Sequence, residues 1–261
     1  MPKLAANLTM MFNEVSFLDR FEAAAAAGFN AVEYMFPYEY DAHLLKETLV
    51  RHRLAQIVHN LPAGNWTEGD RGIGCLPDRV DEFKAGVDTA IRYATALGCR
   101  QINCLAGIRP AALDANDARD TLVNNLRYAA PRLEAAGIKL LLEAVNTRDI
   151  PGFFVSRTSQ ALDIIDAVES DNVFLQYDAY HMQVMEGDLA PTIERHLARI
   201  AHIQIADTPG RHEPGTGEIN YDFVLRFIDR VGYSGWIGCE YKPATTTGAG
   251  LGWTRPYLTR E

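Results

Sequence analysis

The stretch Ala135-Ala-Gly137-Ile-Lys-Leu-Leu-Leu-Glu143 joins a helix end to a short apolar run that stops at a carboxylate. Alanine-rich sequence favours a helix, and the glycine suits the left-handed position after its last turn. The run Leu140–Glu143 is typical of a strand that is buried on both faces, as in a parallel sheet. A helix, a glycine and a buried strand therefore follow one another within nine residues.

The same unit recurs along the chain, for example at Ala26-Ala-Gly28-Phe and Ala96-Leu-Gly98-Cys. Helix-like stretches with apolar residues three and four apart, such as 80–97, separate eight strand-like runs. The expected strands are Leu4–Met10, Ala31–Phe36, Ala55–Asn60, Gln101–Ala106, Lys139–Val145, Val173–Asp178, Ile200–Ala206 and Trp236–Tyr241. Eight β/α units in 261 residues predict an α/β fold, a single (β/α)8 TIM barrel over residues 1–261. A doubly wound sheet would need a glycine-rich phosphate turn after an early strand, and the sequence has none.

Composition limits the classes of partner. A net charge of −9 argues against a nucleic-acid or anionic-membrane surface as the main partner. The sequence contains no run of 18 apolar residues and no leader-like start, so we expect a cytoplasmic protein without a membrane partner. The four cysteines (Cys75, Cys99, Cys104 and Cys239) lack metal-ligand spacing, so we expect buried, reduced thiols.

Four oxygen-bearing side chains end predicted strands in the second half of the chain: Glu143, Asp178, Gln204 and Glu240. In a barrel the carboxyl ends of the strands meet at one mouth, where such side chains would converge. Carboxylate and amide oxygens are the ligands that Mg²⁺ or Mn²⁺ prefers, so we predict one divalent cation there. The alternative, that each residue pairs with some arginine or lysine, is weaker for four positions than for one.

Further polar residues follow the predicted strands. His181 comes just after Asp178, and His59 follows the third strand, so both are expected to contact substrate. Lys242 and Arg211, with Arg71 in another loop, are candidates to bind an anionic group, although solvated loop charge also explains Arg71. His202 is either a residue of the barrel interior or a partner of the ligands, and the sequence does not decide between them.

Several long segments resemble the hydroxypyruvate isomerase family, within the xylose-isomerase-like TIM barrels. That resemblance implies Glu143 and Glu240 as the acid/base pair, which also surround a metal ion with Asp178 and Gln204. One departure is Ala144, where the family often has proline. Ketose 3-epimerases usually have histidine at the position of Gln204. The segments are Ala6–Phe12, Glu33–Tyr38, His59–Trp66, Gln176–Gln183, His202–Asp207, Glu213–Tyr221 and Gly238–Pro243.

The resemblance implies a small 2-oxo-3-hydroxy carboxylic acid as substrate. Hydroxypyruvate would be converted to 2-hydroxy-3-oxopropanoate (tartronate semialdehyde) through an enediolate, as the two glutamates move a proton between C3 and C2. The four-carbon 2-oxotetronate needs the same chemistry and stays an alternative, because one carbon gives little discrimination. A ketose 3-epimerase and a barrel without catalytic activity are weaker alternatives. The sequence does not decide whether the protein forms a homo-oligomer.

Overall fold

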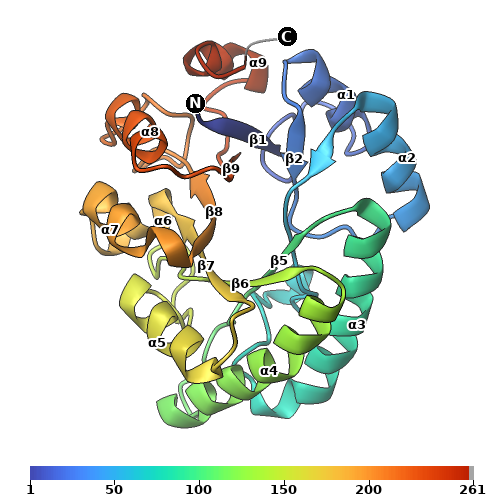
Figure 1. Cartoon of the computed structure of the whole chain (residues 1–261), viewed down its shortest axis with the longest axis vertical. Helices are drawn as coiled ribbons and strands as arrows, with labels where there is room; N and C mark the ends of the chain where they lie inside the picture. Colours follow the sequence, from blue (N-terminus) through green and yellow to red (C-terminus); the bar gives the residue numbers. More distant parts are fainter. Residues whose placement is uncertain (259–261) are drawn as a thin grey trace.

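The computed structural model describes residues 1–258 and shows a parallel sheet of nine strands that curls on itself inside a ring of helices (Figure 1). The order of the strands in the sheet is β3-β2-β1-β9-β8-β7-β6-β5-β4. The strands are β1 (Lys3–Asn7), β2 (Ala31–Glu33), β3 (Ala55–Gln56), β4 (His59–Asn60), β5 (Gln101–Cys104), β6 (Lys139–Glu143), β7 (Val173–Asp178), β8 (Ile200–Ile205) and β9 (Trp236–Cys239).

The two ends of this order are adjacent in the chain, since only Ile57 and Val58 separate β3 from β4. The predicted strand 55–60 is thus assigned as two short strands, because its first half pairs with β2 and its second half with β5. Between them, the amide of Ile57 still donates to the carbonyl of Val32 at 2.9 Å. The count of strands is therefore nine rather than eight, and the sheet closes where β3 meets β4.

The helices pack outside the sheet, as their apolar stripes require. In α3 the buried positions Phe83, Val87, Ala90 and Ala94 recur at three and four, and Gly98 closes the helix in the left-handed conformation (φ +73°). The sequence predicted a helix over 122–133, and α4 extends beyond this range at both ends, while no bounds were predicted for α2, and α6 and α9 were not predicted. The helices are α1 (Asp19–Ala26), α2 (Ala42–His52), α3 (Val80–Leu97), α4 (Ala115–Ala135), α5 (Thr158–Val168), α6 (Ala179–Met185), α7 (Leu189–His196), α8 (Tyr221–Arg230) and α9 (Thr247–Gly250), and 3₁₀ turns cover Trp66–Glu68, Pro77–Arg79, Leu197–Arg199 and Leu251–Thr254.

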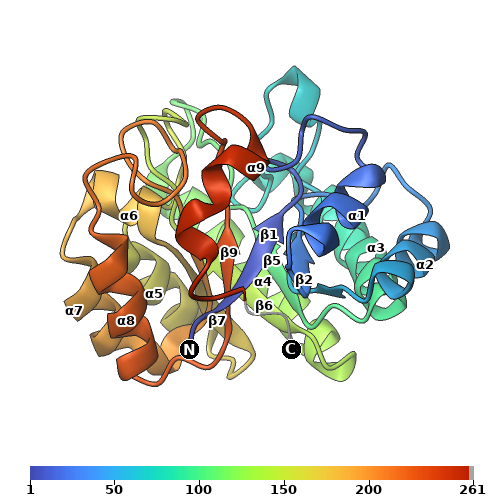
Figure 2. The same ribbon diagram turned by 90° about the horizontal axis from the view of Figure 1, so that it is seen from above.

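Strand register brings the ends of neighbouring strands to one level. Glu143 pairs with Gln176, Asp178 with Gln204, and Gln204 with Gly238. The loops that follow the strands gather at this end of the barrel, and the N-terminus lies at the opposite end (Figure 2). Side chains at the strand ends therefore face a common space, as the sequence predicted for parallel strands.

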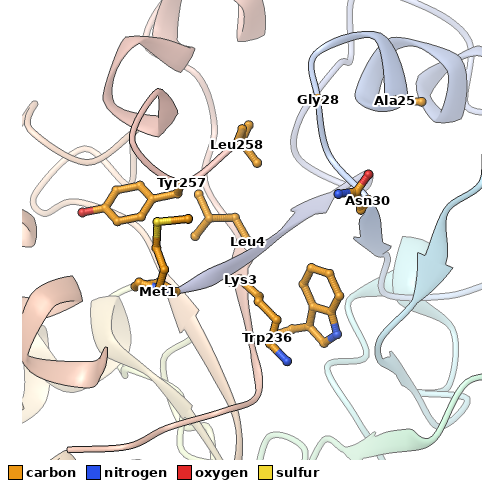
Figure 3. Close-up of a pocket in the computed structure, with 10 residues that line it drawn as sticks. Met1, Lys3, Leu4, Ala25, Gly28, Asn30, Trp236, Tyr257 and Leu258 are labelled. Carbon is orange, nitrogen blue, oxygen red and sulfur yellow. The ribbon is translucent and has the colours of Figure 1, made fainter. Parts of the chain in front are cut away.

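A hollow of about 580 Å³ lies at the opposite end, beside Lys3, Trp236 and Tyr257 (Figure 3). The ammonium of Lys3 lies 5.4 Å from the ring of Trp236. Elsewhere, Cys75, Cys99, Cys104 and Cys239 are buried and unpaired, which confirms the expectation for the thiols. Among residues 1–258, no helix is long and apolar enough to cross a membrane.

Candidate active site

Three buried carboxylates and an imidazole meet at the mouth of the barrel. Glu143 ends β6, Asp178 ends β7, Glu240 follows β9, and His181 lies in the first turn of α6. One potential ligand atom from each of the four lies within 4.8 Å of the others. The convergence of Glu143, Asp178 and Glu240 is the arrangement that their strand-end positions suggested. A cluster of this composition can hold a metal ion.

The carboxylates have strongly perturbed acidities. Burial, together with the charges of Glu240 and Asp178, raises the pKa of Glu143 well above its usual value. Burial raises the pKa of Glu240 to about 8 although Arg211 opposes the shift. Burial also raises the pKa of Asp178, against Arg211 and hydrogen bonds from backbone amides. The buried cluster therefore favours a state in which not all three carboxyl groups are ionised.

Arg211 supplies a fixed positive charge to the cluster. Its Nη2 lies 2.5 Å from Oε2 of Glu240 and 3.6 Å from Oδ2 of Asp178. Its guanidinium also lies 5.0 Å from the ring centre of Tyr180. Burial opposes the charge of Arg211, but the neighbouring carboxylates raise its pKa. Arg211 thus lies against carboxylates of the protein and also lines the cavity above them, and its contact with substrate stays a prediction.

Glu240 is also held from inside the barrel. Asn7 Nδ2 donates to Glu240 Oε1 at 3.1 Å and to Glu33 Oε1 at 2.9 Å. Gln204 Nε2 donates to the same two oxygens, at 3.3 Å and 2.7 Å. His202 Nε2 lies 2.7 Å from the other oxygen of Glu33. His202, which the sequence left undecided, therefore lies in the barrel interior as a partner of Glu33.

Gln204 has a defined orientation. Its oxygen accepts from Gln176 Nε2 at 2.7 Å, while its nitrogen faces the carboxylates of Glu33 and Glu240. An amide oxygen in the place of this nitrogen would face two acceptors, so the carboxylates fix the nitrogen there. Gln204 thus links Glu33 to Glu240. Its role as a metal ligand, for which the oxygen would have to face the cluster, stays a prediction.

The tautomer of His181 follows from its neighbour Asn146. The backbone amide of Asp149 donates to Asn146 Oδ1 at 2.7 Å, which leaves Asn146 Nδ2 to donate to His181 Nδ1 at 2.6 Å. Burial lowers the pKa of His181 well below its usual value, so the ring is neutral and its hydrogen is on Nε2. Nε2 lies 3.5 Å from Oδ2 of Asp178 without a hydrogen bond to it, and 3.5 Å from Nη2 of Arg211, so its hydrogen can be donated to a bound molecule. This favours the predicted contact with substrate over ligation of a metal by His181.

A cavity of about 150 Å³ opens above the cluster. Glu143, His181, Arg211, Glu240 and Lys242 line it, together with Arg71. Lys242 is exposed at its edge. His59 is 1% exposed and lies deeper in the barrel, beside Glu33 and Gln204, while its neighbour Asn60 reaches the cavity. Burial lowers the pKa of His59 to about 4.

The profile of the xylose isomerase-like TIM barrel family matches residues 21–257. Hydroxypyruvate isomerase of Escherichia coli strain K12 is 54% identical over 98% of this chain and 100% of its own length. The chain belongs to the hydroxypyruvate isomerase family. This membership confirms the resemblance that the sequence segments indicated.

Two further proteins are similar to this chain over nearly its whole length. The 2-oxo-tetronate isomerase of Cupriavidus necator is 46% identical to this chain over the full length of both. A crystal structure named AP endonuclease, family 2, from Brucella melitensis superposes with a TM-score of 0.96 at 45% identity, over 98% of this chain and 99% of that one. The barrel and its strand ends therefore belong to a fold already seen in solved structures.

Several residues that shape the site do not stand out in the sequence. Asn103 Nδ2 donates to Glu143 at 2.9 Å, and Asn7, Glu33 and Asn146 act as described above. Asn103 and Glu33 lie inside runs that were predicted as buried strands. Because a buried polar group needs hydrogen-bond partners, a polar residue within such a run was the available signal.

Proposed function

We propose that this protein is an isomerase that interconverts hydroxypyruvate and 2-hydroxy-3-oxopropanoate. The observation that carries the proposal is the pair Glu143 and Glu240, whose carboxylates approach within 4.8 Å from β6 and β9 at the floor of one cavity. The E. coli relative of that name supports the substrate. We also regard β3 and β4 as one interrupted strand, which makes the single domain a (β/α)8 barrel.

The residues present fit a divalent cation. Fully ionised, Glu143, Asp178 and Glu240 carry three negative charges against one positive charge on Arg211, so two negative charges stay unbalanced. Oδ2 of Asp178 is buried without a hydrogen-bond partner. Carboxylate oxygens suit Mg²⁺ or Mn²⁺, and Gln204 would join them as the further expected ligand if its amide turned its oxygen from Gln176 to the cluster. When bound, the ion would acidify the C–H next to the substrate carbonyl.

The protein's own groups perform the proton transfer. One glutamate removes a proton from C3, the other delivers a proton to C2, and the hydroxyl proton on O3 passes to O2, so the atoms balance. A raised pKa suits this exchange, because a carboxyl group with a pKa near the working pH both accepts and donates. Asn103 holds Glu143, and Asn7 and Gln204 hold Glu240, so that both carboxylates keep their positions.

The four-carbon acid 2-oxotetronate is the second candidate substrate. It is favoured by the relative from C. necator, which covers the whole chain at 46% identity. The reacting carbons and both proton transfers are the same for the two acids. A difference of one carbon gives only about 1–3 kcal/mol of discrimination.

The test follows the hydrogen at C3 by NMR. Metal-loaded protein in D₂O should exchange the C3 hydrogen of hydroxypyruvate for deuterium and produce 2-hydroxy-3-oxopropanoate. The same experiment with 2-oxotetronate ranks the two acids by kcat/KM. Absence of both exchange and product with either acid would refute the proposal.

A further inference from the structure

Three cationic side chains line the cavity, and they differ in what their donors already contact. The charge of Arg211 is already balanced by the carboxylates of Glu240 and Asp178, which its Nη2 contacts, although its buried Nε has no hydrogen-bond partner. The ammonium of Lys242 is exposed and has no ion-pair partner within residues 1–258, so nothing fixes its place. Arg71 lies in the loop between β4 and α3. It has free donors and a fixed position, and, unlike Arg211, it has no carboxylate partner among the described residues.

Two backbone carbonyls and one ring fix the guanidinium of Arg71. Nη1 donates to the carbonyl oxygens of Trp66 at 3.0 Å and of Asp70 at 2.6 Å, which uses both of its hydrogens. The guanidinium carbon lies 4.3 Å from the ring centre of Trp66. Nε and Nη2 have no acceptor among the described residues. These two nitrogens form the side-on edge of an arginine, whose parallel hydrogens match the two oxygens of a carboxylate.

The protein offers no acid that would occupy this edge. The neighbouring carboxylate of Asp70 is engaged with Arg79 at 2.7 Å and with the amide of Asn65 at 2.6 Å. Across residues 1–258, no carboxylate lies within ion-pair distance of Arg71. The guanidinium of Arg71 is oriented, partly buried and in direct contact with no carboxylate of the described residues. At the edge of a small cavity, it is suited to bind an anion that enters the cavity.

The loop itself is anchored next to Arg71. The amide of Gly72 donates to the carbonyl of Ala63 at 3.1 Å, and Gly72 forms a bridge with Ala106 of the loop after β5. Gly72 has a φ of +110°, and a side chain there would collide with the backbone of Leu105. The close contact between the two loops therefore requires glycine and keeps Arg71 facing the cavity.

We propose that Arg71 binds the carboxylate of the substrate side-on through Nε and Nη2, and so selects 2-oxo acids over uncharged ketoses. The inference rests on the proposed function for the identity of the acid. The carboxylate at C1 would lie against Arg71 while C2 and C3 lie between Glu143 and Glu240, all of which line the same cavity. Arg71 is thus assigned to substrate binding, and Arg211 to charge balance among the carboxylates.

The test compares Arg71→Met and Arg71→Lys with Arg109→Met, a matched control in the loop after β5. Arg109 bonds the carbonyl of Leu113 and is not among the residues that line the cavity. We expect Arg71→Met to lower kcat/KM for hydroxypyruvate roughly 10- to 100-fold, mainly through KM, as for a lost hydrogen bond to a charged group. Arg71→Lys should recover part of this loss, and Arg109→Met should behave as wild type. Unchanged KM in Arg71→Met would overturn the inference.

A binding measurement separates this inference from the proposed function. Calorimetry with pyruvate, which carries the carboxylate but no C3 hydroxyl, should show weaker binding to Arg71→Met than to wild type. Hydroxyacetone, which has no carboxylate, should bind both proteins equally. If wild type binds pyruvate through Arg71 but isomerises neither acid, the proposed function fails and the inference stands. Equal binding of pyruvate to both proteins would refute the role of Arg71.

Discussion

Nη2 of Arg211 lies 2.5 Å from Oε2 of Glu240, so a proposed acid/base residue is also half of a buried ion pair. The other oxygen of Glu240 accepts from Asn7 and Gln204. Glu143, in contrast, accepts from Asn103 and has no cation of its own among its hydrogen-bond partners within residues 1–258. The two glutamates are therefore inequivalent, and removal of each should have a different secondary effect.

Glu143→Gln and Glu240→Gln should both lose isomerisation, because an amide can neither remove nor deliver the proton. We expect kcat to fall roughly 10²- to 10⁴-fold for each, as is typical of a lost general acid or base. Glu240→Gln should in addition weaken the loss of stability that titration of Glu240 causes as the pH rises from about 5 to about 8, because a neutral amide, which does not titrate, then faces Arg211. Steady-state kinetics and urea denaturation measure the two effects.

Glu218→Gln is the control for these variants, because this glutamate is exposed in the loop before α8. Its kcat should equal that of wild type. Near-normal turnover by Glu143→Gln or Glu240→Gln would show that the carboxylate concerned does not transfer the proton.

Removal of divalent metal should abolish turnover, and added Mg²⁺ or Mn²⁺ should restore it. An ion at 100 times its Kd should stabilise the fold by about 2.7 kcal/mol, which a thermal melt detects. Asp178→Asn should weaken this stabilisation while its side chain still accepts from the amide of Tyr180 at the start of α6. Asp188→Asn, at an exposed position, should respond to metal as wild type does. Equal stabilisation of both variants would exclude Asp178 as a ligand.

Metal affinity should increase with pH because a proton competes with the ion for Glu240. The pKa of this carboxyl is raised to about 8 in the metal-free protein, chiefly by burial. Below pH 8 the ion must displace the proton of Glu240, so Kd should fall as the pH rises from 6 towards 8. In Glu240→Gln this part of the slope should vanish. Calorimetric titrations at several pH values measure it, and the same slope in both proteins would contradict the assignment to Glu240.

The barrel and the carboxylates in its mouth could be predicted from the sequence. The barrel follows from the repeat of apolar residues, and the carboxylates follow from their positions at the ends of apolar runs. Buried parallel strands show as apolar runs, and Glu143 and Asp178 end such runs. The split of residues 55–60 into β3 and β4 was not predictable, since it depends on which neighbour each half pairs with.

The side-chain pairings within the site were harder to predict from the sequence. Arg211 was expected to contact substrate, but its partner depends on how the loop after β8 folds back over Glu240. Asn7 links Glu33 to Glu240, although it is 26 positions from Glu33 and 233 positions from Glu240 in the chain. Local sequence patterns carry no information on such contacts, which only the closed barrel creates.

Gly238→Ala should disturb the site through the barrel interior. A side chain at this position of β9 would collide with the carboxylate of Glu33, which is 1% exposed and linked to Glu240 by Asn7 and Gln204. Overpacking of this kind costs about 1–3 kcal/mol, so both the free energy of unfolding and kcat should fall. Gly248→Ala is the matched control, because nothing lies within 4 Å of the added carbon there. Urea denaturation and steady-state kinetics compare the two. If Gly238→Ala lost stability but kept its kcat, the link between Glu33 and Glu240 would support the fold without positioning the catalytic carboxylate.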